Sequence, residues 1–154
     1  MLHSTTSGFF KRHYEITEDD RPLVTLEHGG REKSSFTLDG VPYSIARDGG
    51  KRLLLTERGR RTGTATRDGG RRWSIDSDAG RFELVKPSMW KDGWELHRDG
   101  TSLGTISKNG AFSKGATADL PADIPLPVRL FAFYIVHVLW QRAASAAAAG
   151  GGGG

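Results

Sequence analysis

The segment Leu126 to Arg142, which reads LPVRLFAFYIVHVLWQR, constrains the fold more than any other part of the chain. Leu130 to Trp140 is a run of eleven residues without a charge, and no proline or glycine follows Pro127 until Gly150. The aromatic and β-branched residues of the run also suit a strand, but the run is too long for an ordinary one. We therefore expect a helix over about 127–142.

The predicted helix is apolar on every face, so it must be surrounded either by protein or by lipid. A transmembrane helix needs about 20 apolar residues, whereas Arg129 and Arg142 enclose only twelve positions. This shortfall favours a helix that is buried in the protein core. From Val128 to Gln141 it would be about 20 Å long, which is close to the height of a small β-barrel.

Almost everything before this segment has the pattern of short antiparallel strands. Large apolar residues alternate along the chain, as in Leu53 and Leu55, which indicates sheets with one buried face. After a mobile start, we expect the first strands within Phe9–Thr17 and Leu23–Glu27, with a turn over Asp19–Pro22. Turn signals that contain glycine recur about every ten residues, at Gly29-Gly30, Asp39-Gly40, Asp48-Gly49-Gly50, Arg58-Gly59, Asp68-Gly69-Gly70, Ala79-Gly80, Asp92-Gly93, Asp99-Gly100 and Asn109-Gly110.

This spacing predicts about 11 or 12 strands, and that many strands enclose more space than their own side chains fill. The apolar helix would occupy the space, as in barrels with a central helix. The predicted fold is therefore mainly β, a closed antiparallel β-barrel of about 11–12 strands around a buried hydrophobic C-terminal helix. Residues 1–142 would form this single domain, and 143–154 a low-complexity Ala/Gly tail.

An internal repeat relates two parts of the predicted barrel. Leu53–Gly69 aligns without gaps on Trp94–Gly110 at an offset of 41 residues, and five positions are identical. Two of the identical positions, Gly63 and Gly104, lie inside predicted strands. A glycine in the interior of a strand indicates a bend or a bulge where the sheet curves.

The repeated hairpins have the form apolar-x-apolar-x-x-x-Gly-x-x-x-Gly-Thr, and the lead LPADIPLPV precedes a wholly apolar terminal helix. This arrangement resembles the tubby C-terminal-like superfamily, which includes the LURP-one-related proteins and the phospholipid scramblases. The resemblance covers nearly the whole chain, rests on architecture, and implies a closed barrel around the terminal helix. Tubby domains bind phosphoinositide headgroups, and scramblases are linked to lipid movement and calcium. No stretch here matches the tubby headgroup motif or a calcium loop, so the resemblance assigns no site residue.

The positive charge of the chain is concentrated in one stretch. Residues 47–72 carry nine basic and three acidic residues, a net charge of +6, whereas residues 1–46 have a net charge of −2 and residues 73–154 are neutral. Such a stretch suits an anionic lipid surface or a nucleic-acid backbone. Solvated strands carry basic residues too, because these protect sheet edges from pairing. No aromatic platform accompanies the arginines, which disfavours nucleic acid.

The candidate lipid-binding residues come from this stretch and from the turn region that follows it. Trp90 lies outside the alternation of its neighbouring strand and suits either an interfacial anchor or packing at the rim. The arginines would lie at opposite ends of a hairpin, which divides them between two turns. The full set is Arg58, Arg60, Arg61, Arg67, Arg71, Arg72 and Trp90.

Nothing in the sequence indicates catalysis. The chain has no cysteine, and its five histidines show no metal-ligand spacing. His137 lies within the apolar run, where we expect a neutral, hydrogen-bonded core residue whose network could include Tyr134. We find no nucleophile elbow, phosphate-binding loop or apolar pair of carboxylates. We therefore expect no enzyme activity, no cofactor and no metal site.

Two functions fit these observations. The first is a non-enzymatic binding or scaffold module that binds anionic phospholipid peripherally through the basic residues. The second is a protein-interaction module with an unknown partner and no lipid role. The N-terminus lacks the apolar core of a signal peptide, so we expect a cytoplasmic protein that is peripheral to the membrane if it binds lipid.

Overall fold

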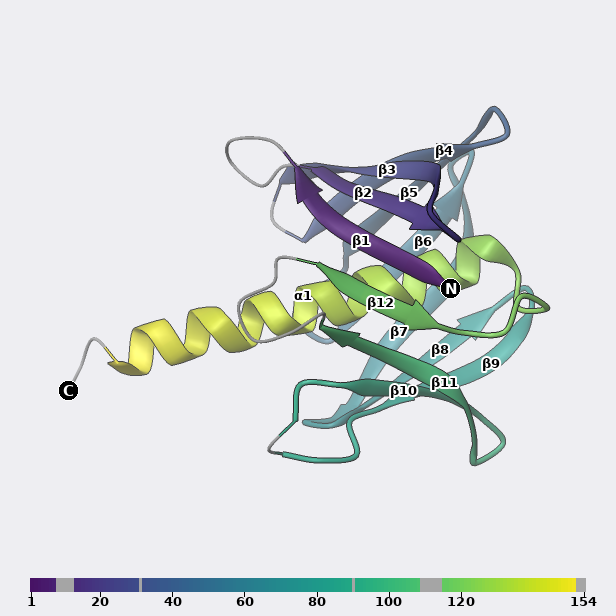
Figure 1. Cartoon of the computed structure of the whole chain (residues 1–154). Coiled ribbons are helices and arrows are strands. Elements are labelled where there is room, and N and C mark those ends of the chain that lie inside the picture. Colours follow the sequence, from purple (N-terminus) through teal and green to yellow (C-terminus); the bar gives the residue numbers. More distant parts are fainter. Residues whose placement is uncertain (8–12, 31, 90, 109–114, 152–154) are drawn as a thin grey trace.

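The computed structural model describes residues 1–7, 13–30, 32–89, 91–108 and 115–151. Within these residues the chain forms a closed barrel of twelve antiparallel strands around one helix, α1, so the predicted fold is confirmed (Figure 1). The strands are β1 (Leu2–Ser7), β2 (His13–Glu18), β3 (Arg21–Gly30), β4 (Lys33–Leu38), β5 (Val41–Arg47), β6 (Arg52–Glu57), β7 (Arg60–Gly69), β8 (Arg72–Ser77), β9 (Gly80–Val85), β10 (Trp94–Arg98), β11 (Thr101–Lys108) and β12 (Ala116–Asp119), and α1 spans Leu126–Gly151.

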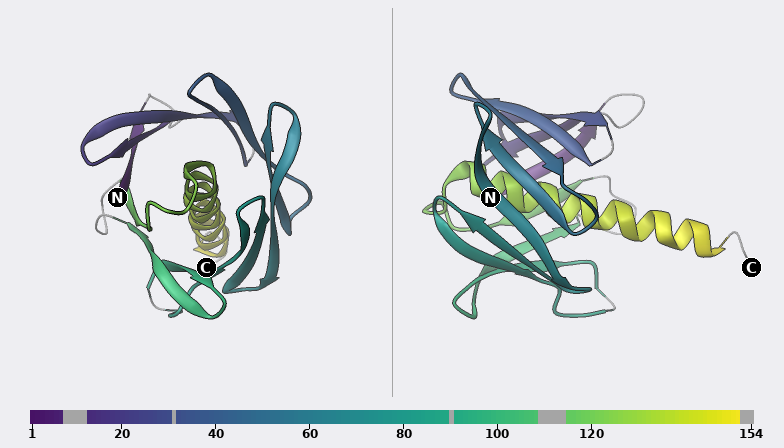
Figure 2. Two further views of the ribbon diagram at one scale, coloured as in Figure 1. Left: turned by 90° about the vertical axis from the view of Figure 1, so that its right-hand side faces the viewer. Right: turned by 180° about the vertical axis from the view of Figure 1, so that it is seen from behind.

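Each strand pairs with its neighbours in the sequence, and β1 pairs with β12 to close the barrel. Figure 2 shows α1 running along the inside of the ring of strands and projecting from one side. Because the strands alternate in direction, successive turns lie at opposite ends of the barrel. We call the end at which α1 begins the helix-start end; it carries the turns after β2, β4, β6, β8 and β10. The opposite end is the helix-exit end, and it carries the connections after β5, β7 and β9.

The core lies between the inner faces of the strands and α1. Every residue from Val128 to Val138 is buried, including all faces of the helix. The strands contribute alternate side chains to the same core, such as Leu53 and Leu55 from β6 and Ile75 from β8, each at most 1% exposed. Burying a large apolar side chain contributes about 1.5–3 kcal/mol. The uniform burial explains why this helix has no polar face.

The helix is longer than the predicted 127–142, because it begins at Leu126 and continues to Gly151. Alanine has the highest intrinsic helix propensity, so the run of alanines after Arg142 extends the helix although its side chains are exposed. The part of α1 beyond Arg142 therefore projects from the helix-exit end of the barrel (Figure 2).

The expectation of a mobile start is wrong for Leu2–Ser7, which forms strand β1. This strand lies between β2 and β12, and the buried side chains of Leu2 and Ser4 point into the core. The turn predicted over Asp19–Pro22 is also shorter, since Asp19 and Asp20 alone connect β2 and β3. The alternation signal missed β1 because four of its six residues are serine or threonine.

The internal repeat corresponds to the β6–β7 and β10–β11 hairpins, and both contain a bulge at the equivalent place. Leu55 pairs with Gly63 before a register shift, and Leu96 pairs with Gly104 before the same shift. The predicted bulges are therefore confirmed. A Cβ atom at Gly104 would lie 2.0 Å from the carbonyl oxygen of Asp119, the last residue of β12, so glycine permits a close approach of β11 to the end of β12.

Candidate functional site

The two ends of the barrel carry opposite charge. At the helix-exit end, residues 32–33, 47–52, 67–72, 86–92, 108 and 142 contain eleven basic and four acidic residues, a net charge of +7. At the helix-start end, residues 18–21, 39–40, 57–61, 76–81, 98–101 and 119–123 contain six basic and ten acidic residues, a net charge of −4. The amino terminus and Arg129 add two positive charges to the helix-start end, and they pair there with Asp19 and Glu18.

The predicted lipid-binding arginines are divided between these two ends. Strand β7 is ten residues long, so its ends are about 30 Å apart at a rise near 3.3 Å per residue. The structure brings the first three of the six to the helix-start end and the last three to the helix-exit end. The first group is Arg58, Arg60 and Arg61, and the second is Arg67, Arg71 and Arg72. Trp90 lies outside the described residues.

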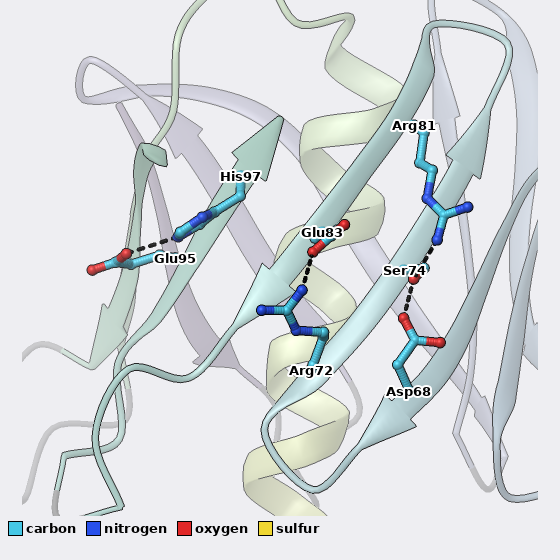
Figure 3. Close-up of polar contacts among 7 residues, drawn as sticks. All are labelled: Asp68, Arg72, Ser74, Arg81, Glu83, Glu95 and His97. Carbon is cyan, nitrogen blue, oxygen red and sulfur yellow. Dashed lines mark hydrogen bonds and ion pairs between the residues drawn. The ribbon is translucent and has the colours of Figure 1, made fainter. Parts of the chain in front are cut away.

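Carboxylates neutralise part of each group. Nη2 of Arg60 lies 3.1 Å from Oδ2 of Asp78 and 3.9 Å from Oε2 of Glu57. On the outer face of β8 and β9, Nη1 of Arg72 lies 2.6 Å from Oε2 of Glu83 (Figure 3). Arg72 is thus paired on the barrel wall, and it could bind an anion at the end of the barrel only if it broke its ion pair with Glu83.

The outer face of the barrel wall carries three further polar contacts. The Ser74 hydroxyl donates to the Asp68 carboxylate, and Nη2 of Arg81 donates to Oγ of Ser74 at 3.1 Å (Figure 3). Nε2 of His97 lies 2.9 Å from Oε1 of Glu95. The contacts of Ser74 join β7, β8 and β9, whereas the His97–Glu95 contact lies within β10.

Seven basic residues at the helix-exit end form no ion pair with any described residue. Sequence reasoning missed three of them, because Lys33, Lys86 and Lys91 lie outside the basic stretch of the sequence. They could have been predicted from the order of the turns along the chain, because every second turn of an antiparallel meander lies at the same end of the barrel. The seven are Lys33, Arg47, Lys51, Arg67, Arg71, Lys86 and Lys91.

A large apolar side chain is exposed at the same end of the barrel. Met89, between Lys86 and Lys91, is 71% exposed, in contrast to the apolar side chains of the core. At the same end, a cavity of about 340 Å³ lies between α1 and the ends of β7–β10. The helix-exit end therefore combines unpaired positive charge, an exposed apolar side chain and a cavity.

Arg142 anchors the helix at the point where it leaves the barrel. Its Nε and Nη2 donate to the two carboxylate oxygens of Glu32 at 2.8 and 2.6 Å, and Nη1 donates to the carbonyl oxygen of Gly50 at 2.9 Å. The hydrogen bonds to Glu32 raise the pKa of Arg142, against the opposing effect of burial. Because its donors are committed to the protein, Arg142 is a structural cation.

His137 is the buried histidine of the core, as expected. Its Nδ1 lies 2.7 Å from the carbonyl oxygen of Phe133, which can only accept, so Nδ1 carries the proton. Nε2 then accepts a hydrogen bond from the Ser4 hydroxyl at 2.9 Å. Burial lowers the pKa of His137 from 6.5 to about 4, against a smaller opposing effect of the Phe133 carbonyl.

Tyr134 does not share the His137 network, contrary to the expectation from the sequence. Its hydroxyl is buried and has no hydrogen-bond partner among the described residues. Burial, and to a lesser degree Tyr14 and Glu32, raise its pKa. The helix is joined to β2 by other side chains, among them Gln141, whose amide donates to the Tyr14 hydroxyl.

Within the described part of the chain, no three histidine or acidic side chains gather as a metal site would require. The helix in that part is also not long and apolar enough to cross a membrane. Comparisons of the chain with models of protein families, with curated proteins and with solved structures find no match.

Proposed function

We propose that this chain is a non-enzymatic module that binds anionic phospholipid surfaces through the helix-exit end of its barrel. The observation that carries the proposal is that seven unpaired cations and the exposed Met89 lie at the same end of the barrel. Basic residues near an anionic bilayer contribute about 1 kcal/mol each, and an apolar side chain adds affinity by entering the interface. The protein would then lie on the cytoplasmic face of a membrane as a peripheral protein.

The polarity of the barrel supports this orientation. The helix-exit end has a net charge of +7 and the opposite end is acidic, so an anionic surface attracts one end and repels the other. Of the candidate residues from the sequence, Arg67 and Arg71 are the ones that fit this role best. The resemblance to the tubby C-terminal-like superfamily agrees with a lipid ligand, and we propose membership of that superfamily on the barrel and its central helix.

Sedimentation with vesicles tests the proposal. Phosphatidylcholine vesicles with and without phosphatidylserine are compared at low and at physiological salt. The protein should sediment with the anionic vesicles at low salt and much less at physiological salt, because salt screens exposed charges. Replacing Arg67, Arg71 and Lys91 by Ser should weaken binding by about 1 kcal/mol for each charge.

The matched control removes three charges from the opposite end, by Arg58→Asn, Arg60→Ser and Arg61→Ser. Asparagine suits position 58, where φ is +51°. This variant should sediment like the original protein. Equal binding to neutral and anionic vesicles, or equal losses from the two triple variants, would reject the proposal. An absence of binding to both vesicle types would favour the protein-interaction module.

A further inference from the structure

The cavity at the helix-exit end has an apolar wall and a cationic rim. Its volume of about 340 Å³ lies at the lower end of the range for small-molecule pockets, about 300–1,000 Å³. Three of the four tryptophans of the chain line it, together with Leu139. Arg67 and Lys86 supply cations beside this apolar surface. The lining thus differs from the solvated turns around it.

Trp73, Trp94 and Trp140 form part of the lining of the cavity, and the guanidinium of Arg142 lies 5.6 Å from the centre of the Trp73 ring. Trp73 and Trp94 are 1% and 4% exposed, so the barrel holds them in place. Nε1 of Trp140 donates to the carbonyl oxygen of Asp92 at 2.7 Å, which satisfies its polar atom, and Nζ of Lys108 lies 5.3 Å from the centre of its ring. A ligand that enters the cavity therefore meets a preformed apolar surface.

The cations of the rim are not neutralised. Lys86 is half-buried and forms no ion pair with a described residue, and the side chain of Arg67 has one contact, from Nε to the carbonyl oxygen of Gly69 at 3.3 Å. The nearest carboxylate in the lining, that of Asp92, is 3.5 Å from Nζ of Lys108 and faces that cation. Arg142, the third cation of the lining, is held by Glu32. An anion at the rim would thus find two available cations.

We propose that this cavity binds one amphiphilic anion, with its carboxylate or phosphate head between Arg67 and Lys86 and the first part of its chain against the indoles. A half-buried cation beside an apolar surface favours an anion that carries its own apolar group, because both surfaces are then desolvated together. The source is either a lipid of the bilayer or a free amphiphile. The bilayer source rests on the proposed function, whereas a free amphiphile needs no membrane.

Monomeric amphiphiles test the cavity without a membrane. Decyl phosphate, decanoate, decyl maltoside, decyltrimethylammonium and inorganic phosphate are titrated below their micelle concentrations. Tryptophan fluorescence reports occupancy of the cavity, and calorimetry gives the affinity. The two amphiphilic anions should bind at least about tenfold more tightly than the neutral and cationic amphiphiles, a difference of about 1.4 kcal/mol. Inorganic phosphate alone should leave the fluorescence unchanged.

Two variants locate the bound anion. Ala143 is exposed and lines the cavity, so Ala143→Phe should fill it and weaken decyl phosphate binding at least about tenfold. Ala144→Phe is the matched control, because Ala144 is also exposed on the helix but does not line the cavity. Replacing Arg67 and Lys86 by Ser should remove the preference for anions and keep weak binding of the decyl chain. Circular dichroism verifies that each variant is folded.

The outcomes separate this inference from the proposed function. Decyl phosphate binding that survives Ala143→Phe, or equal affinity for decyl maltoside, overturns the cavity as an anion site. Binding of decyl phosphate without sedimentation on anionic vesicles supports the cavity with a free amphiphile as its source, and rejects the membrane proposal. Loss of both activities in Ala143→Phe, with both kept in Ala144→Phe, supports a bilayer lipid as the occupant.

Discussion

The Ser4 hydroxyl donates a hydrogen bond to Nε2 of His137 at 2.9 Å, and this bond joins residues that are 133 positions apart in the sequence. It links the first strand of the barrel to the central helix, close to the β1–β12 pairing that closes the sheet. His137 is also enclosed by the rings of Tyr14, Phe133 and Trp140, at centroid distances of 4.8, 4.7 and 5.4 Å. The neutral imidazole of His137 therefore holds β1, one of the two strands that close the barrel, against the central helix.

Acid should destabilise the protein through His137. Its pKa is lowered to about 4 in the folded state, below the unfolded value near 6.5, so the unfolded chain binds more protons between these pH values. The stabilising effect is complete above pH 6.5 and is lost as the pH falls toward 4. The full change amounts to about 3 kcal/mol, since each pKa unit corresponds to about 1.4 kcal/mol. Unfolding by denaturant at a series of pH values measures it.

The matched variants for this pH dependence are His137→Gln and His97→Gln. The first should flatten the stability curve between pH 6.5 and 4 at a cost in overall stability. The second changes a histidine on the outer face of β10, and it serves as the control for the loss of an imidazole outside the core. An NMR titration in which His137 protonates at pH 6.5 or above would contradict the prediction.

Alanine at the two equivalent glycines of the repeat should have unequal effects. At Gly104 the new methyl group would lie 2.0 Å from the backbone oxygen of Asp119, and backbone cannot yield as a side-chain tip can. At Gly63 it would meet the side chains of Leu55 and Phe131 at 3.3 Å, which small shifts can relieve. We expect Gly104→Ala to cost about 3 kcal/mol or more and Gly63→Ala about 1 kcal/mol. Equal costs in chemical denaturation would show that the β11–β12 approach is not tight.

Removal of the Glu32 carboxylate should weaken the attachment of α1 to the barrel at Arg142. Glu32 is 9% exposed and accepts two hydrogen bonds from Arg142, and a hydrogen bond to a charged group contributes about 1.5–3 kcal/mol. Glu32→Gln should therefore lower the free energy of unfolding by about 2 kcal/mol. Glu15→Gln, on the exposed face of β2, is the control and should change it little. The same melting temperature for both variants would argue against a structural role of the pair.

Truncations should separate the buried and exposed parts of α1. A chain that ends at Leu126 lacks the eleven buried residues from Val128 to Val138, so the barrel loses its core and should not fold. A chain that ends at Ala143 keeps those residues and the Arg142–Glu32 pair, and it should melt nearly like the full chain. Circular dichroism and thermal unfolding distinguish the two, and a cooperative melt of the shorter chain would refute the central role of the helix.

The sequence by itself determined the architecture. Period-two alternation and glycine turns about every ten residues predict a meander of short strands, and a helix without a polar face needs protein on every side. These signals are local, because the backbone of each turn and the burial pattern of each strand depend on the residues within it. The bulges at Gly63 and Gly104 and the buried state of His137 followed from the same kind of local pattern.

The tertiary structure alone decided how the barrel closes and what its ends contain. Strand β1 is mostly polar, and it is a strand because it pairs with β2 and with the distant β12. Strand β7 divides the basic stretch of the sequence between the two ends of the barrel. The described cations of the helix-exit end come from the connections after β5, β7 and β9, from the strand ends at Lys33 and Lys108, and from the helix. Such a cluster depends on which turns share an end and which carboxylates are within reach. Those relationships are long-range, so neither composition nor periodicity in the sequence encodes them.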